Sequence, residues 1–490
     1  MKNTKLQKYY PWIVVALLWV VALLNYMDRQ MLSTMRESMQ VDIAELEEAV
    51  NFGRLMAIFL WIYGLVSPVA GAVADRISRK WLIVGSLGVW SAVTLLMGYS
   101  TSFGQIYWLR ALMGVSEALY IPASLSLIAD YHTGKARSFA IGVHMTGLYV
   151  GQAVGGFGAT VASMFSWQET FHWFGIIGIA YAVVLIFFLH ENRGTRQSEA
   201  EAARPKADLS VWRSFGLLLS NIAFWVVLFY FASSSLPGWA TKNWLPTLFA
   251  DSLGVPMSAA GPISTFTIAF SSFLGVMIGG PLSDRWVKRN LRGRIYTSAI
   301  GLGLMVPALV LLGLGHGMYA AVGAGLCFGV GFGMFDTNNM PILCQFVPVR
   351  LRATAYGIMN MTGVFAGAAC TEVLGRWADG GNLGLGFALL GGVIAVALFV
   401  QLSVLRPTTD TTWSDPLPGN GKGPAERRQG LFSCSGVRSA MQGRQLMMTL
   451  AKYSRSSEAA RSSCSGVFSL TSHNRYSSPI ASYLCTPSVW

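Results

Sequence analysis

Long apolar segments separated by short polar ones dominate the chain up to about residue 406. A helix needs about 20 apolar residues to cross a bilayer, and twelve segments meet that length. The pattern therefore predicts an all-α membrane protein that crosses the bilayer twelve times. The predicted crossings are 11–35, 52–73, 81–99, 103–128, 137–162, 170–190, 219–248, 259–282, 293–314, 318–346, 353–375 and 383–405.

Composition agrees with this class, because 53% of the residues are hydrophobic and 12% are charged. The first apolar segment is too long for a cleavable signal peptide, and it lacks a small-residue cleavage site. The six cysteines have no metal-site spacing, so neither a metal nor another cofactor is expected. No catalytic motif is found at a bilayer face, and an enzyme is not expected.

The net charge of +13 reflects membrane orientation. Basic residues follow the second, fourth, sixth, eighth and tenth crossings, whereas the segment after the first crossing is acidic. This is the positive-inside pattern, which predicts both termini in the cytoplasm and a place in the cell inner (plasma) membrane. The bilayer, and not a nucleic acid, is the expected partner of these charges.

Two motifs occur twice, which indicates an internal repeat. Gly71-Ala-Val-Ala-Asp75-Arg76 returns as Gly280-Pro-Leu-Ser-Asp284-Arg285, and Lys135-Ala-Arg137 returns as Arg350-Leu-Arg352. The two motifs keep their order and return at nearly the same offset. A repeat of six crossings is typical of alternating-access transporters. The predicted parts are a bundle at 1–190, a cytoplasmic loop at 191–218, a bundle at 219–406 and a disordered tail at 407–490.

The motif at 71–80 and its weaker copy at 280–289 resemble the loop signature of the major facilitator superfamily, and the resemblance covers about residues 8–406. It implies two pseudo-symmetric six-helix bundles. The motif residues are expected to form a latch that closes the cytoplasmic side; the alternative is a basic loop that only sets topology. The latch residues are Gly71, Asp75, Arg76, Arg79, Lys80, Asp284 and Arg285.

Polar residues inside the first crossing are candidates for a site. Asn25, Asp28, Arg29 and Ser33 follow i, i+3, i+4 spacing and are expected to share one face. A charge in the bilayer costs about 2.5–3.5 kcal/mol on insertion scales, so it usually has a partner or a function. The face is interpreted as a substrate or proton site, or else as an internal Asp–Arg pair that fixes helix packing.

Later crossings add further candidates. In the fourth, Arg110 is expected to snorkel outward, whereas Glu117 lies deeper and suits proton exchange or a structural ion pair. Asp336 and Asn360 suit substrate contact or packing networks. Lys242 and Trp244 are expected at the outer membrane interface, with a gating or substrate role of Lys242 as the alternative.

The segment Asn25-Tyr26-Met-Asp28-Arg29 and the segment Arg110-x-x-x-Gly114-x-x-Glu117 resemble the anion:cation symporter branch of that superfamily. Gln168 stands where that branch usually has Arg. The resemblance implies import of sugar acids with protons. It assigns the substrate carboxylate to Arg29, proton coupling to Asp28, Glu117 and Arg110, and further substrate contacts to Tyr26 and Asn360. Asn25 and Asp336 complete the candidate substrate site.

The sequence thus predicts a monomeric, proton-coupled symporter of a small organic anion. Two alternatives stay open. The same motifs also resemble spinster-like lipid transporters, so a lysolipid or drug carrier is possible within the superfamily. A non-transporting membrane sensor that signals through its tail is the alternative from another class.

Overall fold

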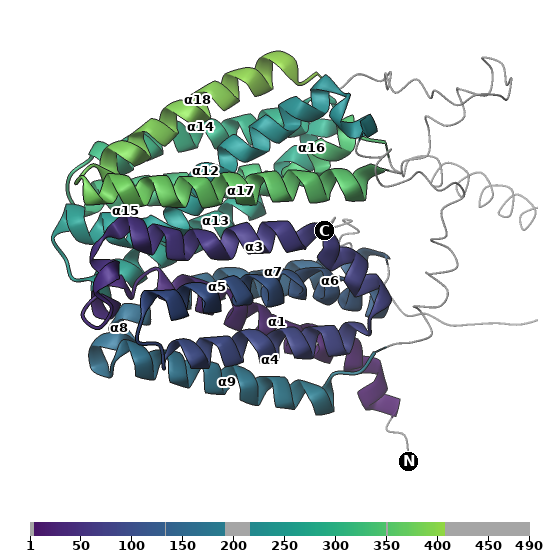
Figure 1. Ribbon diagram of the computed structural model, residues 1–490. Helices are drawn as coiled ribbons and strands as arrows, with labels where there is room; N and C mark the ends of the chain where they lie inside the picture. Colours follow the sequence, from purple (N-terminus) through teal and green to yellow (C-terminus); the bar gives the residue numbers. More distant parts are fainter. Residues whose placement is uncertain (1–3, 133, 192–215, 349–350, 407–490) are drawn as a thin grey trace, which may run out of the picture. The chain divides into compact units, whose positions relative to one another are not determined.

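The structure is a computed structural model that describes residues 4–132, 134–191, 216–348 and 351–406, almost entirely as helices (Figure 1). Among these described residues, eleven helical segments are long and apolar enough to cross a membrane. The remaining predicted crossing, the fifth at 137–162, is α7 (Gly134–Gly155), whose glycines and polar side chains make it less apolar. The all-α polytopic fold is confirmed. The predicted tail at 407–490 and most of the predicted loop at 191–218 lie outside the described residues.

Each half contributes six crossings. The N-terminal half contains α1 (Thr4–Leu32), α2 (Arg36–Met39), η1 (Ala44–Glu47), α3 (Ala49–Arg76), α4 (Arg79–Met97), α5 (Phe103–Ala118), α6 (Tyr120–Tyr131), α7, α8 (Gly158–Met164) and α9 (Trp167–Phe188). The C-terminal half contains α12 (Ile222–Leu253), α13 (Met257–Val287), α14 (Gly293–Leu314), α15 (Met318–Asp336), α16 (Asn339–Phe346), α17 (Arg352–Asp379) and α18 (Leu383–Val404).

Local sequence signals set the ends of α12, the longest of these helices. Asn221 caps its start by accepting a hydrogen bond from the backbone N–H of Ala223 at 2.8 Å. Gly254 ends it in the left-handed conformation, with φ of 62°. Between these residues α12 runs for 32 residues. At a rise of about 1.5 Å per residue it is longer than the bilayer's hydrocarbon core.

The fourth and tenth crossings are each broken near the middle, which the apolar pattern did not predict. α5 ends at Ala118 and α6 starts at Tyr120, while α15 ends at Asp336 and α16 starts at Asn339. At the second break, the Asn338 side chain donates to the carbonyl oxygen of Met334 at 2.8 Å. Irregular backbone is tolerated at membrane depth where protein or a watery cavity surrounds it.

A line of glycines joins α7 closely to α1, as their spacing predicts. A Cβ added at Gly151 would lie 2.3 Å from the carbonyl oxygen of Leu23, and Gly147 and Gly155 meet α1 backbone in the same way. Because only a hydrogen fits at these positions, α1 and α7 are in backbone contact over about two helical turns.

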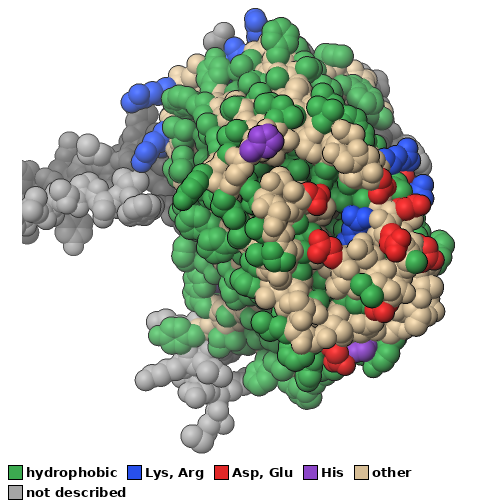
Figure 2. Space-filling model, turned by 90° about the vertical axis from the view of Figure 1, so that its left-hand side faces the viewer, with side chains coloured by type: hydrophobic (Ala, Val, Ile, Leu, Met, Phe, Trp, Pro, Cys, Tyr) green, Lys and Arg blue, Asp and Glu red, His purple; other side chains and the backbone are tan. Residues whose placement is uncertain are grey.

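The two halves meet along α3 and α17, which lie side by side (Figure 1), and along α7 and α13. We call the end that carries segment 33–48 the acidic end, and the opposite end the basic end. Acidic side chains gather on the acidic end (Figure 2). There the Asp379 carboxylate of α17 accepts hydrogen bonds from the backbone N–H groups of Ala49 and Val50, at 2.5 and 2.9 Å. The first turn of α3 is therefore capped by the opposite half.

Candidate functional site

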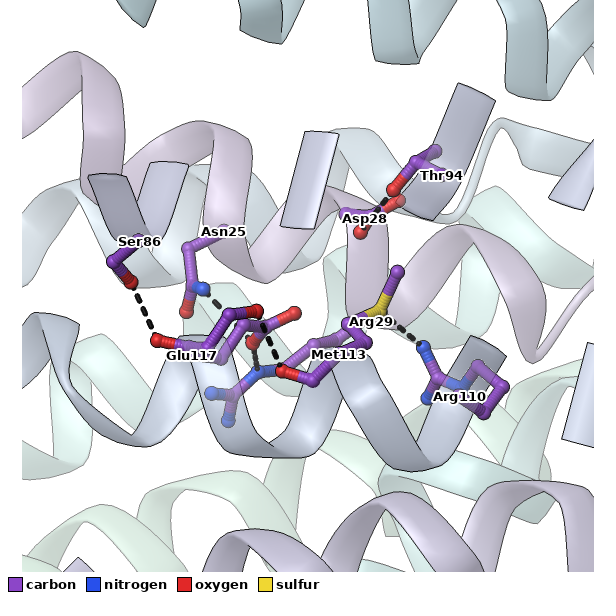
Figure 3. Close-up of polar contacts among 9 residues, drawn as sticks. Asn25, Asp28, Arg29, Ser86, Thr94, Arg110, Met113 and Glu117 are labelled. Atoms are coloured by element: carbon purple, nitrogen blue, oxygen red, sulfur yellow. Dashed lines mark hydrogen bonds and ion pairs between the residues drawn. The ribbon is translucent and has the colours of Figure 1, made fainter. Parts of the chain in front are cut away.

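Arg29 of α1 lies beside a buried carboxylate (Figure 3) and also among aromatic rings. Its Nε donates to Oε2 of Glu117 on α5, a residue with 0% exposure. Asn25, one turn earlier on α1, donates to the same oxygen at 2.8 Å. Arg29 therefore faces the protein interior and not the lipid. Its guanidinium lies 5.2, 4.8 and 4.8 Å from the ring centres of Tyr26, Phe59 and Tyr63.

Both members of this ion pair keep a polar atom without a hydrogen-bond partner among the described residues. These atoms are Nη2 of Arg29 and Oε1 of Glu117. A free guanidinium N–H suits an anionic oxygen, and a free carboxylate oxygen suits a proton. Each member of the pair thus keeps one polar atom whose hydrogen-bonding capacity is unused.

Asp28 lies apart from this pair, which corrects the prediction of one shared polar face. It points to α4, where Thr94 donates its hydroxyl to Asp28 Oδ2 at 2.9 Å (Figure 3). It also lines a cavity of about 10 Å³, room for about one water molecule. Successive residues on a helix are separated by about 100°. Asp28 and Arg29 consequently point to different neighbours, and Ser33, just after α1, instead bonds back to Gln30.

Arg110 does not snorkel, contrary to the prediction. It is 2% exposed, and its guanidinium lies 4.7 Å from the ring centre of Phe59, the ring that Arg29 also covers. Its nearest polar contact is the sulfur of Met113 at 3.0 Å. Arg110 is attracted to Asp28 and Glu117. The four charged residues Asp28, Arg29, Arg110 and Glu117 therefore balance one another inside the N-terminal half.

Lys242, in the C-terminal half, does not lie at the outer membrane interface that the sequence predicted. Its ammonium lies 5.9 Å from the ring centre of Tyr26, 4.7 Å from that of Trp239 and 6.0 Å from that of Phe332. Trp244 is fully buried, and its indole N–H donates to the Thr371 carbonyl oxygen at 2.9 Å. The prediction of an interfacial pair is wrong because α12 continues to Leu253, which leaves both residues well inside the helix.

Asp336, the last residue of α15, is exposed. It interacts electrostatically with Lys242 and with Tyr26 of α1. Asn339 lies 3.4 Å from its Oδ1. Asp336 therefore has electrostatic neighbours on helices of both halves.

Asn360 of α17 is half-buried and makes no side-chain hydrogen bond to a described residue. It lies one turn from Val364, whose side chain would be 3.2 Å from a Cβ added at Gly64 of α3. Asn360 is thus placed near the seam between the halves, but no contact with Arg29 is present.

The described latch residues pair inside their own halves. Arg79 forms an ion pair with Asp130, and Lys80 donates to the Ile186 carbonyl oxygen at 2.7 Å. Asp284 lies 3.6 Å from Arg294, and Arg285 is exposed. The side chains of Gly71, Asp75 and Arg76 lie outside the described part of the chain.

A comparison with family models matches residues 18–371 to the Major Facilitator Superfamily. The chain belongs to this superfamily. Among its relatives in the superfamily, the D-galactonate transporter of Escherichia coli O6:H1 is 22% identical over 418 residues, which are 80% of this chain and 94% of that protein. Sodium-dependent phosphate transport protein 1 of Arabidopsis chloroplasts (Arabidopsis thaliana) is 26% identical over 409 residues, 78% of each protein.

A solved major facilitator structure has the same fold. A bacterial homologue of the human lysosomal transporter Spinster, in an inward-facing and occupied conformation, superimposes with a TM-score of 0.65. The match covers 80% of this chain and 96% of that chain, at 18% identity. This likeness concerns the fold alone.

Sequence reasoning missed the aromatic lining of the site and the cap that Asp379 places on α3. Phe59, Tyr63 and Trp239 are ordinary apolar-helix residues in sequence, and no local pattern marks them as neighbours of a cation. Asp379 and Ala49 are 330 residues apart. One signal was available for Lys242, because the apolar pattern continues for several residues after it.

Proposed function

We propose that this chain is a secondary active transporter that moves a small organic anion, such as a hexuronate or aldonate, in symport with protons. The ion pair between Arg29 and Glu117 carries the proposal. An arginine in a water-poor site is a strong receptor for a carboxylate, because its planar fork matches both oxygens. In this protein the Glu117 carboxylate already occupies part of the Arg29 guanidinium.

Glu117 and the substrate carboxylate would compete for Arg29. When Glu117 is ionised, it holds the guanidinium through Nε. When Glu117 takes up a proton, its negative charge is lost and Arg29 can bind the anion. Proton and substrate then favour the same state of the protein, which is thermodynamic linkage and the basis of symport.

Asp28 and Arg110 complete the proposed coupling machinery. Asp28 is a second carboxylate that can take a proton, and it lies beside Thr94 and the small cavity. Arg110 is attracted to both carboxylates. A proton on either acid would leave the four charges with a net positive balance, which favours an incoming anion.

The substrate class is proposed from chemistry and relatives together. Tyr26, Asn25, Asn360 and Asp336 offer hydroxyl, amide and carboxylate groups that suit a polyhydroxy acid. D-Galactonate, the substrate in the name of the Escherichia coli relative, is such an acid. The Arabidopsis relative is named for sodium dependence, so the coupling ion needs a direct test.

The halves would rock around this site, as in alternating access. In the proposed orientation, a monomer lies in the inner (plasma) membrane with both termini in the cytoplasm. The acidic end then faces outward and is held closed by the Asp379 cap. The latch residues at the basic end would pair across the halves when that end closes.

Uptake of labelled acids by proteoliposomes, with a proton or a sodium gradient, tests the function. Glu117→Gln should lose accumulation driven by a pH gradient but retain substrate exchange, because glutamine cannot carry the proton. The matched control is Glu169→Gln, which alters an exposed glutamate at the start of α9. Accumulation by the Glu117 variant at the wild-type level would refute proton coupling through this residue.

Arg29→Lys tests the receptor role separately. Lysine keeps the positive charge but lacks the planar fork, so uptake of the anion should fall at least tenfold. The ratio of uptake to protein incorporated in the membrane corrects for expression. Uptake equal to that of the wild type would remove Arg29 from the substrate site.

One observation favours a second candidate, a carrier of lysolipids or other amphipathic molecules. The cations are lined by several aromatic rings, namely Tyr26, Phe59, Tyr63, Trp239 and Phe332. Such a surface also suits an apolar chain next to a charged head. Competition for uptake by hexuronates and by lysolipids separates the two functions.

A further inference from the structure

The small cavity beside Asp28 lies inside the N-terminal half. Its volume is about 10 Å³, and the described residues that line it come from α1, α4 and α9. Asp28 of α1, Ser91 and Thr94 of α4 and Gly178 of α9 are among them, and the other lining residues are apolar or aromatic. No residue of the C-terminal half is part of this lining. The cavity is therefore distinct from the surroundings of Arg29, where the substrate is expected.

Three polar side chains line the cavity. Asp28, Ser91 and Thr94 are 6%, 3% and 2% exposed, so all three are buried. Thr94 donates its hydroxyl to Oδ2 of Asp28 at 2.9 Å (Figure 3). The other carboxylate oxygen, Oδ1, accepts no hydrogen bond from a described residue. One acceptor on the wall of the cavity is thus unused.

The Ser91 hydroxyl is also unused. It makes no hydrogen bond to another described residue, whereas the Ser86 hydroxyl of the same helix donates to the Ser116 carbonyl oxygen. Buried hydroxyls in proteins are usually satisfied by a protein group or by an ordered water molecule. A Cβ added at Gly178 would lie 2.1 Å from Ser91 Oγ. Glycine at this position therefore leaves the room that the hydroxyl occupies.

The size and the chemistry of the cavity match a single water molecule. A cavity of this volume has room for about one water molecule, which needs two to four polar partners to bind stably. Oδ1 of Asp28 and the hydroxyl oxygens of Ser91 and Thr94 provide that number. Water can both donate to the carboxylate oxygen and bond to the serine hydroxyl, so it satisfies both unused groups at once.

The charge of Asp28 gives such a water molecule a role. Asp28 has no ion-pair partner at contact distance among the described residues. The charged groups that interact with it from a greater distance are Arg29, Arg110 and Glu117. A buried carboxylate is costly unless it is paired or hydrogen-bonded. Thr94 supplies one donor, and a water molecule held by Ser91 supplies a second.

We propose that Asp28, Ser91 and Thr94 bind one water molecule, and that Ser91, acting through this water, is a positioning residue for proton uptake by Asp28. The proposal rests on the proton coupling proposed above and adds residues to it. In the proton step, the water passes a proton from hydronium to Oδ1, so that one O–H bond breaks, another forms and neutral water remains. Because all three lining helices belong to one half, the water site stays intact when the halves rock.

Infrared difference spectroscopy of the purified protein tests the water site. Difference spectra between acidic and alkaline pH, recorded in ordinary water and in water labelled with heavy oxygen, identify internal water, because its bands move with the oxygen isotope. Ser91→Ala should lose one water band of the wild type. Gly178→Ala should lose the same band, since its methyl group takes the room without removing a polar group. Ser86→Ala is the control and should keep the band, because its hydroxyl bonds to the Ser116 carbonyl oxygen.

Proteoliposome uptake measures the consequence for proton coupling. Ser91→Ala should lower the rate of uptake driven by a pH gradient about tenfold, the effect of losing one hydrogen bond to a charged group. Substrate exchange needs no net uptake of protons, so its rate should change less than twofold. Ser86→Ala should leave both rates at the wild-type level.

The outcomes separate this inference from the proposed function. If Ser91→Ala keeps every water band, no water is bound by Ser91 and the inference is overturned. Equal slowing of exchange and of driven uptake would make Ser91 a structural residue only, which also overturns it. So would a rise in Tm with sodium over potassium that Ser91→Ala abolishes, because the cavity would then hold a cation. If the wild type shows no proton-driven uptake, the proposed function fails, whereas the spectra still decide whether the water is bound.

Discussion

Removing the Asp379 carboxylate should open the acidic end. Asp379 is the last residue of α17, and its two oxygens accept the backbone N–H groups of Ala49 and Val50 at the start of α3. These bonds link the halves where they touch outside the membrane core. An acid at a helix N-terminus is also favoured by the helix dipole. Asp379→Ala deletes these interactions and leaves no replacement acceptor.

The magnitude follows from the geometry. A hydrogen bond to a charged group contributes about 1.5–3 kcal/mol, and because Asp379 is exposed, both bonds lie at the lower end of this range. The two bonds together contribute about 3 kcal/mol to the closed state. Since 1.4 kcal/mol is about tenfold in an equilibrium constant, the population open at the acidic end should rise about 100-fold.

Thiol labelling measures this shift. Ala49 is 1% exposed in the closed state, so a cysteine at this position reacts with a maleimide only when the end opens. The six native cysteines are first replaced. In purified protein the labelling rate should rise about 100-fold on Asp379→Ala. Glu45→Ala, which removes an exposed acid from the same end, should leave the rate unchanged. A change of less than about threefold with Asp379→Ala would show that the cap does not hold this end closed.

Two further predictions concern pH and helix packing. Burial and the Asp251 carboxylate raise the pKa of Glu37 above its ordinary value of 4.5. Glu37 therefore binds its proton more tightly in the closed state than in the open state. This difference stabilises the closed state fully below pH 4.5, and the stabilisation is lost as pH rises through the raised pKa. The labelling rate of Glu37→Gln relative to its parent should accordingly fall with rising pH. Gly151→Ala, which brings a methyl within 2.3 Å of the Leu23 carbonyl oxygen, should lower the Tm by several degrees. Gly142→Ala on the same helix meets nothing within 4 Å and should leave the Tm unchanged. An equal Tm for both glycine variants would contradict the close contact of α1 and α7.

The crossings could be predicted because bilayer thickness sets a minimum apolar length, which the sequence meets twelve times. The break after Ala118 could not be predicted from the apolar pattern, but Pro122 marks it, because a proline lacks the N–H of a continuous helix and is tolerated in the first turn of α6. The seventh crossing was predicted to end at residue 248, whereas α12 continues to Leu253 and Gly254 ends it. That displacement alone moved Lys242 from the interior to the membrane surface in the prediction.

The candidate site was predicted in part. Spacing placed Asn25 and Arg29 on one face, and both contact Glu117. The direction of Asp28 depends on Thr94, a neighbour 66 residues away in sequence. The burial of Arg110 depends on Phe59, a ring from another helix. Contacts of this kind arise from helix packing, which a single sequence does not determine.

The bond from Gln30 to Lys242 has a consequence for leakage. Arg29 and Glu117 both belong to the N-terminal half, so their ion pair survives when the halves separate at the acidic end. The bond of Gln30 crosses the interface and is broken by that separation. Arg29 therefore responds to protonation of Glu117, whereas the adjacent Gln30 responds to the movement of the two halves. In the proposed cycle, a carrier without cargo would keep Glu117 ionised and paired with Arg29 while the halves separate, which would limit the futile passage of protons.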